Sequence, residues 1–395
     1  MSVLNDYIIT TIDNRGRNPK YLSKGKYPVI DNVLIKNTLY PNMEDVSRYL
    51  DQDQFDHFLR GYVHKNMPII TLVGNGIGNV TLAPSDKVAI VQNTIGFQVN
   101  DKMDEVFLYY YLLYSRERIR NFNRGSGQPS IRKTDILGMN VIAPSIEIQK
   151  KVSELLFAID SKILINTQIN KNLSHQLRLI FQHTFLDEEH PEWPVEKLGS
   201  FLSLERGLSY KGKFLSDSEG VPMVNLGNIL PNSVFRPEKL KFYTGDFKAK
   251  VIVKPGDIVV ANTDLTQARE VLGSAILIPD LDYPTIICSH HISIVRDCRI
   301  SKHFIHGMLN SPSYRERVIG FATGTTVLAL PSETILNCEF ALPPNELIIK
   351  YDSIAESYYQ KSEQLRKENQ QLTQLRDTLL PQLMSGQLDV SAVSL

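Results

Sequence analysis

The chain has 395 residues, of which 42% are hydrophobic and 22% charged, a composition typical of a globular protein. Its 43 Lys and Arg residues balance 43 Asp and Glu residues, so the chain lacks the overall positive charge of a strongly non-specific DNA binder. No apolar run reaches the roughly 18 residues of a membrane span, and the start has no secretory signal pattern. We therefore expect a cytoplasmic protein of two or three domains, in which any DNA-binding charge is local.

The chain contains an internal repeat, offset by roughly 195 to 199 residues. The matched segments are 28–31 with 222–225, 78–84 with 273–279, 113–115 with 309–311 and 124–129 with 321–326. Their common order indicates a duplicated architecture. Within each half, short runs rich in Val and Ile are broken by turn residues, as at Lys254–Asp257. This pattern predicts one mixed α+β domain per half.

Each half ends in a segment whose apolar residues recur every seven positions. These residues are Val152, Ile159, Leu173 and Ile180 in the first half, with polar Asn166 between them, and Tyr351, Tyr358, Leu365, Leu372 and Leu379 in the second half. A seven-residue repeat over about 40 residues predicts two long helices that pair as a coiled coil. Asn170 and Asn369 occupy equivalent positions, and polar residues in such an interface often fix its register. Two amphipathic helices on separate cores are the alternative.

The predicted fold class is α+β, with two mixed domains joined by two long antiparallel coiled-coil helices and approximate two-fold internal symmetry. The first domain is expected over 1–144 and the first helix over 145–186. The second domain is expected over 187–343, and the second helix with its tail over 344–395. The acidic segment 187–192, which contains a proline, marks the boundary after the first helix.

We find no motif that predicts catalysis or a cofactor in this chain. Residues 74–78, Gly-Asn-Gly-Ile-Gly, resemble a nucleotide or S-adenosylmethionine loop, but a strand-like run follows them where a helix would be required. They are predicted to form a hairpin turn. The sequence has no P-loop, HExxH, GxSxG or Asn-Pro-Pro-aromatic motif. Tyr109, Tyr110 and Tyr111 lie in a helical run and are expected to pack in the core.

The cysteines do not predict a metal site either. Cys288, Cys298 and Cys338 form no CxxC pair, which favours reduced thiols. Cys288 lies close to His290 and His291, but a zinc site needs four ligands at recognisable spacing. The alternation of Ile286, Cys288, His290, Ile292 and Ile294 predicts instead one face of a strand.

The remaining features suit nucleic-acid recognition. Loops that combine Arg, Lys, Asn, Gln, Ser and Thr with glycines can approach phosphates closely and reach base edges. The candidate DNA-binding residues are Arg15, Arg17, Asn75, Arg124, Ser126 and Gln128 in the first half, and Arg206, Tyr210, Lys211, Asn262, Thr325 and Thr326 in the second. For each residue the alternative is an ordinary exposed polar loop.

Residues 368–386 strongly resemble the distal conserved helix of the specificity (HsdS) subunits of type I restriction–modification systems. Residues 193–199 resemble the family's entry into a second recognition domain, and 253–259 resemble a recurrent strand turn. Residues 142–147 and 341–346 resemble the starts of its spacer helices, so the resemblance covers essentially the whole chain. The first half departs from the pattern, because it has no counterpart of Trp193–Gly199 and no clear Pro-Gly-Asp turn.

The resemblance implies a non-catalytic subunit that binds double-stranded DNA. Each domain would be a target-recognition domain for one half of a bipartite, asymmetric site, and the helices would set the spacing and dock two methyltransferase subunits. Restriction–translocase subunits would complete the complex, with S-adenosylmethionine, ATP and Mg²⁺ bound by the partners. The rival interpretations are a non-DNA duplicated coiled-coil scaffold, which the neutral charge favours, and a self-contained methyltransferase.

Overall fold

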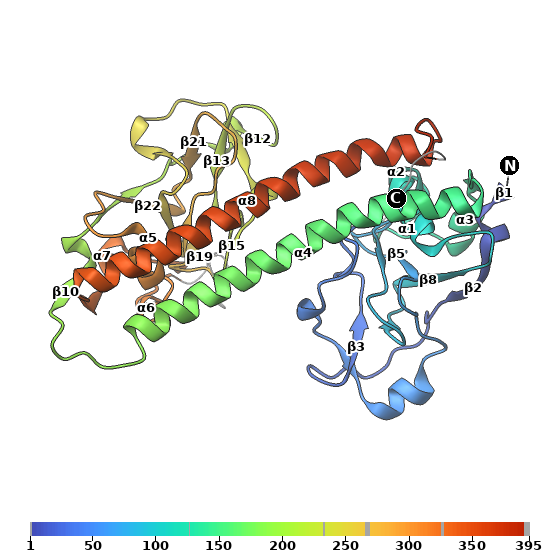
Figure 1. Cartoon of the computed structure of the whole chain (residues 1–395), viewed down its shortest axis with the longest axis horizontal. Coiled ribbons are helices and arrows are strands. Elements are labelled where there is room, and N and C mark those ends of the chain that lie inside the picture. Colours follow the sequence, from blue (N-terminus) through green and yellow to red (C-terminus); the bar gives the residue numbers. More distant parts are fainter. Residues whose placement is uncertain (1, 126, 232–233, 265–268, 325–327, 391–395) are drawn as a thin grey trace. The chain divides into compact units, whose positions relative to one another are not determined.

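The computed structural model describes residues 2–125, 127–231, 234–264, 269–324 and 328–390. The chain forms two compact units, one of Met1–Gln168 with Arg366–Leu395 and one of Ile169–Leu365. The long helices α4 (Ile146–Phe185) and α8 (Asn345–Met384) each contribute one half to each unit (Figure 1). Each unit therefore combines a mixed sheet-and-helix domain with two half-helices, and the predicted fold class is confirmed.

The domain of the first unit is built around a four-stranded antiparallel sheet of order β2-β8-β5-β6. A smaller sheet has the order β4-β3-β7, and β1 pairs with β9. The strands are β1 (Ser2–Val3), β2 (Ile8–Ile12), β3 (Tyr27–Ile30), β4 (Tyr49–Leu50), β5 (Pro68–Thr71), β6 (Val80–Leu82), β7 (Ala89–Ile90), β8 (Thr94–Val99) and β9 (Asn140–Val141), and the short helices are α1 (Glu105–Tyr114), α2 (Arg116–Arg120) and α3 (Lys133–Leu137).

The second unit repeats this plan with a four-stranded antiparallel sheet of order β11-β22-β18-β20. A five-stranded sheet, β12-β16-β13-β21-β17, takes the place of the smaller sheet. The strands are β10 (Val195–Lys197), β11 (Ser203–Arg206), β12 (Leu215–Ser216), β13 (Val221–Val224), β14 (Ile229–Leu230), β15 (Val234–Phe235), β16 (Lys241–Tyr243), β17 (Ile252–Val253), β18 (Ile258–Ala261), β19 (Thr263–Asp264), β20 (Ala275–Leu277), β21 (Ile286–Cys288), β22 (Ile292–Arg296), β23 (Leu328–Ala329) and β24 (Glu339–Ala341), and the short helices are α5 (Lys302–Met308), α6 (Pro312–Gly320) and α7 (Ser332–Leu336).

The strand pairing confirms the internal repeat and locates the start of its first copy. In the second unit β10 pairs with β24, and in the first unit the equivalent pair is β1 with β9. Strand β1 (Ser2–Val3) of the first domain is therefore the structural equivalent of β10 (Val195–Lys197). The sequence around β1 has no counterpart of the Trp-Pro motif that precedes β10.

In the first unit, α1 packs on the sheet and beneath the two long half-helices. Tyr109, Tyr110 and Tyr111 of α1 are buried, which confirms their predicted place in the core. The same apolar cluster contains Val152 and Leu156 of α4 together with Leu380, Leu383 and Met384 of α8. Burial of apolar surface is the main favourable term in folding, so this domain depends on residues from both long helices.

Polar contacts set the register of the half-helices in the first unit. The Asp160 carboxylate, on a residue only 4% exposed, accepts hydrogen bonds from the Tyr110 hydroxyl at 2.8 Å and from Nη1 of Arg376 at 2.9 Å. Asn166 is fully buried and donates to Oδ1 of Asn369 at 2.9 Å. Residues that increase in number along α4 thus face residues that decrease along α8, so the two half-helices run antiparallel.

In the second unit, aromatic packing replaces the charged contact. Phe181 and Phe185 of α4 lie 5.1 to 5.7 Å from the rings of Tyr351 and Phe304. The Tyr359 hydroxyl lies 2.6 Å from Nδ1 of His306. Tyr359 is the repeat equivalent of Asp160, and Leu177 is the repeat equivalent of Arg376, because each pair is separated by the repeat offset of 199 residues. Two uncharged residues therefore occupy the positions of the ion pair. The Tyr358 hydroxyl donates to Oε1 of Gln176 at 3.3 Å, while Tyr351 lies against Phe181 and Phe185, so α4 and α8 run antiparallel here too.

The predicted helix-pairing residues lie at the interface to different degrees. Val152, Ile159, Asn166, Tyr351 and Leu365 are buried, whereas Asn170, Leu173, Ile180, Tyr358, Asn369, Leu372 and Leu379 are half-buried. Asn369 bonds to Asn166 rather than to its repeat equivalent Asn170. The buried Oδ1 of Asn170 has no hydrogen-bond partner in the described part of the chain.

Replacement of Arg376 by leucine, the residue at the equivalent position of the other repeat, should destabilise the first unit by about 3 kcal/mol, because it leaves the buried Asp160 carboxylate without its cation. The double variant D160N/R376L should recover much of this loss, since it removes the unpaired charge. Urea unfolding followed by circular dichroism measures both. Additive effects of D160N and R376L on the unfolding free energy would contradict the pairing. Trp193, the only tryptophan, lies in the second unit's core, so its fluorescence should not change.

Acid should weaken the second unit through His306. Burial and, to a smaller extent, the nearby His303 together lower the pKa of His306 from 6.5 to about 4. Because the unfolded chain binds this proton first as the pH falls, the stabilisation is complete above about pH 6.5 and is lost as the pH approaches 4. The variant H306Q should reduce the loss of unfolding free energy over that range by up to about 3 kcal/mol. Urea unfolding monitored by Trp193 fluorescence tests this, and an equally steep pH dependence in the variant would refute it.

Candidate nucleic-acid interface

In the first unit, the polar loops meet at one end of the four-stranded sheet, which we call the loop end. Strand β2 ends at Ile12, β5 ends at Thr71 and β8 begins at Thr94, and the antiparallel register places these three positions at the same edge. The loop end is therefore made by residues 13–17, 72–79 and 91–93. Residues 72–79 connect β5 to β6 as the predicted hairpin turn.

A hollow of about 510 Å³ opens at this loop end. It is lined by Asn75, Ile77, Glu117, Arg120, Asn121, Asn123 and Pro129. Two contacts shape it: the amide of Gly74 donates to the carbonyl of Pro129 at 2.9 Å, and Arg116 donates to Oδ1 of Asn79 at 2.9 Å. The structure thus brings Asn75 beside the 123–129 segment, two features that the sequence could only propose separately.

The predicted DNA-binding residues of the first domain differ in whether their side chains already form ion pairs within the domain. Arg15 pairs with Asp13 at 2.5 Å, and this hydrogen bond raises the pKa of Arg15. Arg124 pairs with Asp135 at 2.8 Å. Arg17 is exposed and lies over the ring of Phe58 at 5.7 Å, and Asn75 and Gln128 are exposed. Ser126 lies outside the described residues.

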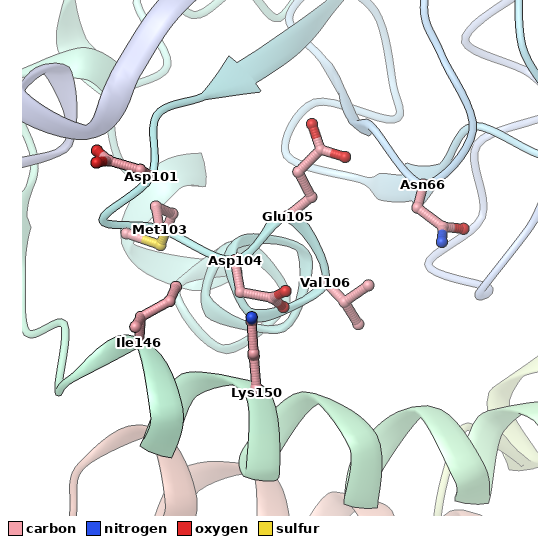
Figure 2. Close-up of a pocket in the computed structure, with 8 residues that line it drawn as sticks. All are labelled: Asn66, Asp101, Met103, Asp104, Glu105, Val106, Ile146 and Lys150. Carbon is pink, nitrogen blue, oxygen red and sulfur yellow. The ribbon is translucent and has the colours of Figure 1, made fainter.

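The opposite end of the same sheet is acidic. A hollow of about 360 Å³ is lined there by Asn66, Asp101, Met103, Asp104, Glu105, Val106, Ile146 and Lys150 (Figure 2). Asp104 caps α1 and accepts from the Ser153 hydroxyl at 2.6 Å, while Glu105 lies 2.7 Å from His64. Burial raises the pKa of Glu105, and His64 partly offsets this. Carboxylates repel phosphates, so the loop end is the end of this sheet that suits a nucleic acid.

The second unit has an equivalent loop end. Strand β11 ends at Arg206, β18 ends at Ala261 and β22 begins at Ile292. Here the amide of Gly207 donates to the carbonyl of Ile292 at 3.0 Å, and that of His290 to the carbonyl of Leu208 at 2.8 Å. A Cβ on Gly207 would lie 2.2 Å from the carbonyl oxygen of Ser289, so this close approach requires glycine.

Three predicted residues of the second domain gather around His290. Arg206 donates through Nε to the carbonyl of His290 at 3.1 Å, and the Tyr210 ring lies 5.4 Å from the imidazole. Asn262 is 5% exposed and donates to the Ser293 hydroxyl at 3.1 Å. Lys211 is exposed. Thr325 and Thr326 lie outside the described residues.

The sequence prediction for His290 and His291 was wrong in one respect. The strand expected over 286–294 is broken, because β21 ends at Cys288 and β22 begins at Ile292, and both histidines lie in the turn. The consecutive polar residues at 289–291 were the available signal. The rings lie 3.9 Å apart, and burial, the positive Arg206 and, for His291, its neighbour His290 lower both pKa values. Neutral imidazoles offer both a donor and an acceptor to a base edge.

Three residues shape the loops through contacts that were not anticipated from the sequence. Asn14 is fully buried and donates to the carbonyl of Ile90 at 3.1 Å. Arg116 orients Asn79, as described above. Arg315 donates to the carbonyls of Leu272 and Glu270, the latter at 2.8 Å, and so fixes part of the loop after β18. Their partners lie far away in the sequence, which hides them from a pattern search.

Two further functions have no site in the part of the chain that is described. No group of three or more His, Cys, Asp or Glu residues among these residues could bind a metal ion. Within the same ranges, every helix is too short or too polar to span a bilayer. Cys288 is fully buried, and burial raises the pKa of its thiol, so it is not a reactive nucleophile.

Comparison with known proteins agrees with this architecture. Residues 9–175 match the family model described as Type I restriction modification DNA specificity domain. The chain is 24% identical over 83% of its length to the type I restriction enzyme MjaVIII specificity subunit of Methanocaldococcus jannaschii, covering 80% of that protein. It is 22% identical over 71% of its length to the HindI specificity subunit of Haemophilus influenzae, covering 76% of it.

Among solved structures, the fold resembles the type I restriction–modification S subunit from M. genitalium, with a TM-score of 0.57 and 17% identity over 97% of this chain and 95% of that one. Two mixed domains, each completed by long paired half-helices, give the chain a duplicated architecture. Residues 9–175 thus match the DNA specificity domain of type I restriction–modification systems, and the chain as a whole resembles the specificity (HsdS) subunits of those systems.

Proposed function

We propose that the chain is the DNA-reading subunit of its complex and has no catalytic site of its own. Each domain would bind one half of a bipartite target through its loop end. The observation that carries this proposal is the gathering of Arg and Asn side chains at the same end of the four-stranded sheet in both units, joined in the second unit by His290 and His291, because these groups suit phosphates and base edges.

The differences between the loop ends support an asymmetric target. In the first unit the loop end presents amide side chains around a hollow, including Asn75, Asn121 and Asn123. In the second unit it presents Tyr210 beside two adjacent histidines, His290 and His291, whose rings are tilted by 38° to each other. Asparagine pairs best with adenine, whereas imidazoles and a tyrosine offer another pattern of donors and acceptors. Two different half-sites follow from two different surfaces.

We assign spacing and partner docking to α4 and α8. A helix of 40 residues is about 60 Å long, which would set the unread distance between half-sites. Both helices carry exposed apolar side chains, including Ile165, Leu179 and Leu375 at 51%, 51% and 48% exposure. Two adenine methyltransferase subunits would dock on the helices and bring S-adenosylmethionine. Restriction–translocase subunits would bring ATP and Mg²⁺.

A duplicated coiled-coil scaffold without DNA is the second candidate. It is favoured by the formal net charge of zero. A scaffold would also dock partner proteins on the helices. It would not explain why polar loops gather at one end of each sheet.

Co-expression with a cognate methyltransferase, followed by long-read mapping of methylated adenines, tests the proposed function. A single bipartite, non-palindromic motif should appear only when both proteins are present. A stable complex without a motif would support the scaffold, and a palindromic motif would contradict the assignment of different half-sites to the two domains.

Lys211→Gln should weaken binding of the second half-site about tenfold, roughly 1.4 kcal/mol, because it removes a charged donor at the loop end. Lys254, exposed in the turn before β18 at the other end of the same sheet, provides the matched control Lys254→Gln. Fluorescence anisotropy with a target duplex measures the Kd, and co-purification measures assembly with methyltransferase. Lost assembly, or equal effects of both variants, would show that Lys211 does not act on DNA.

A further inference from the structure

The residues Asn14–Lys26, which we call the basic segment, carry an unusual concentration of positive charge for a neutral chain. The segment contains Arg15, Arg17, Lys20, Lys24 and Lys26 and no Asp or Glu. The corresponding stretch of the second repeat, 207–220, contains two lysines, one aspartate and one glutamate. The charge therefore belongs to one repeat only, and the duplicated fold does not require it.

The basic segment is packed against the domain rather than extended into solvent. Leu22 and Tyr49 exchange backbone hydrogen bonds of 2.8 and 2.9 Å. Gly25 lies so close to strand β4 that a Cβ on this glycine would come within 3.0 Å of the Cβ of Tyr49. Arg60 donates to the carbonyl of Arg15 at 2.6 Å. These contacts give the segment a defined path, so its charges have defined positions.

Its lysines are nevertheless available to a ligand. Lys20, Lys24 and Lys26 are exposed, and none of them makes an ion pair with any residue in the described ranges. Lys26 lies over the ring of Tyr27 at 5.1 Å, and the neighbouring Arg48 lies over the ring of Tyr21 at 5.1 Å. Cations over aromatic faces are oriented but keep their charge, which reduces the ordering cost of a later contact.

The nearest acidic residues along the paired strand do not neutralise the segment. Asp51 accepts hydrogen bonds from the amide and side chain of Gln54, and Asp56 accepts from Gln52. Arg15 is the one member of the segment that is paired, with Asp13. Four cations remain for an external anion.

We propose that the basic segment binds the phosphate backbone of DNA, without reading sequence, and supplies electrostatic affinity that the chain as a whole lacks. The inference rests on the proposed function and deepens it, since it assigns backbone contact to the first domain in particular. The cations of the basic segment are spread over thirteen residues, so the segment suits a ligand with several anionic groups in a row. Duplex DNA is such a ligand, because its phosphates recur at short, regular intervals.

The test compares two matched double variants of the full chain. K20Q/K24Q removes two charges from the basic segment, and K65Q/K102Q removes two exposed charges at the acidic end of the first unit's sheet. Fluorescence anisotropy gives the Kd for a duplex with the mapped motif and for one without it, between 50 and 300 mM salt. The slope of log Kd against log salt should fall by about 1.8 for K20Q/K24Q on both duplexes and stay unchanged for K65Q/K102Q.

The outcomes separate this inference from the proposed function. Motif-specific binding with an unchanged slope in K20Q/K24Q, or with equal changes in both variants, would overturn the basic segment alone. A reduced slope without any motif preference in the parent protein would support the segment and overturn sequence recognition. Unchanged circular dichroism and an unchanged urea unfolding midpoint by circular dichroism in both variants confirm that the fold of the first unit is intact.

Discussion

The antiparallel pairing of α4 with α8 is the constraint on which both domains depend. In the first unit the apolar core draws on the start of α4 and the end of α8, so it is incomplete without a segment that follows the second domain in the sequence. The Asp160 carboxylate lies at this junction, between Tyr110 of the domain and Arg376 of the distant helix. A buried carboxylate is costly unless both partners are present, so this contact admits one register.

The duplicated chain places different chemistry at equivalent positions of its two units. Asp104 of the first domain accepts from Ser153 of α4, whereas Ser301 of the second domain donates to Asp352 of α8, with the two residue types exchanged. The positions of Asp160 and Arg376 are taken by Tyr359 and Leu177. If the first half paired with a copy of itself, leucine would replace Arg376 beside the carboxylate. The exchanged residues therefore favour pairing of the first half with the second over pairing of either half with a copy of itself. Two identical repeats could not discriminate between these pairings.

Much of the architecture could be predicted because it depends on short-range periodicity. The seven-residue series from Val152 and from Tyr351 predicts the helices, and the Gly-rich 74–78 run before a strand predicts a hairpin. The parts that escaped prediction depend on distant partners. Asn166 bonds to a residue more than 200 positions away, and Arg315 contacts a loop more than 40 positions before it. The turn at His290 was missed because the flanking isoleucines fit an unbroken strand.

The balance of charge over the whole chain conceals its distribution within the first unit. One end of the four-stranded sheet carries Asp101, Asp104 and Glu105, whereas the loop end carries Arg120 and the first residues of the basic segment, including Arg17. Helix α1 runs from the acidic end towards the loop end, so acids lie at its N-terminus and Arg116 and Arg118 follow its C-terminus, the arrangement that the helix dipole favours. The charges that favour this helix locally therefore also orient the domain towards an anionic ligand, and a neutral chain can acquire a positive face without changing its total charge.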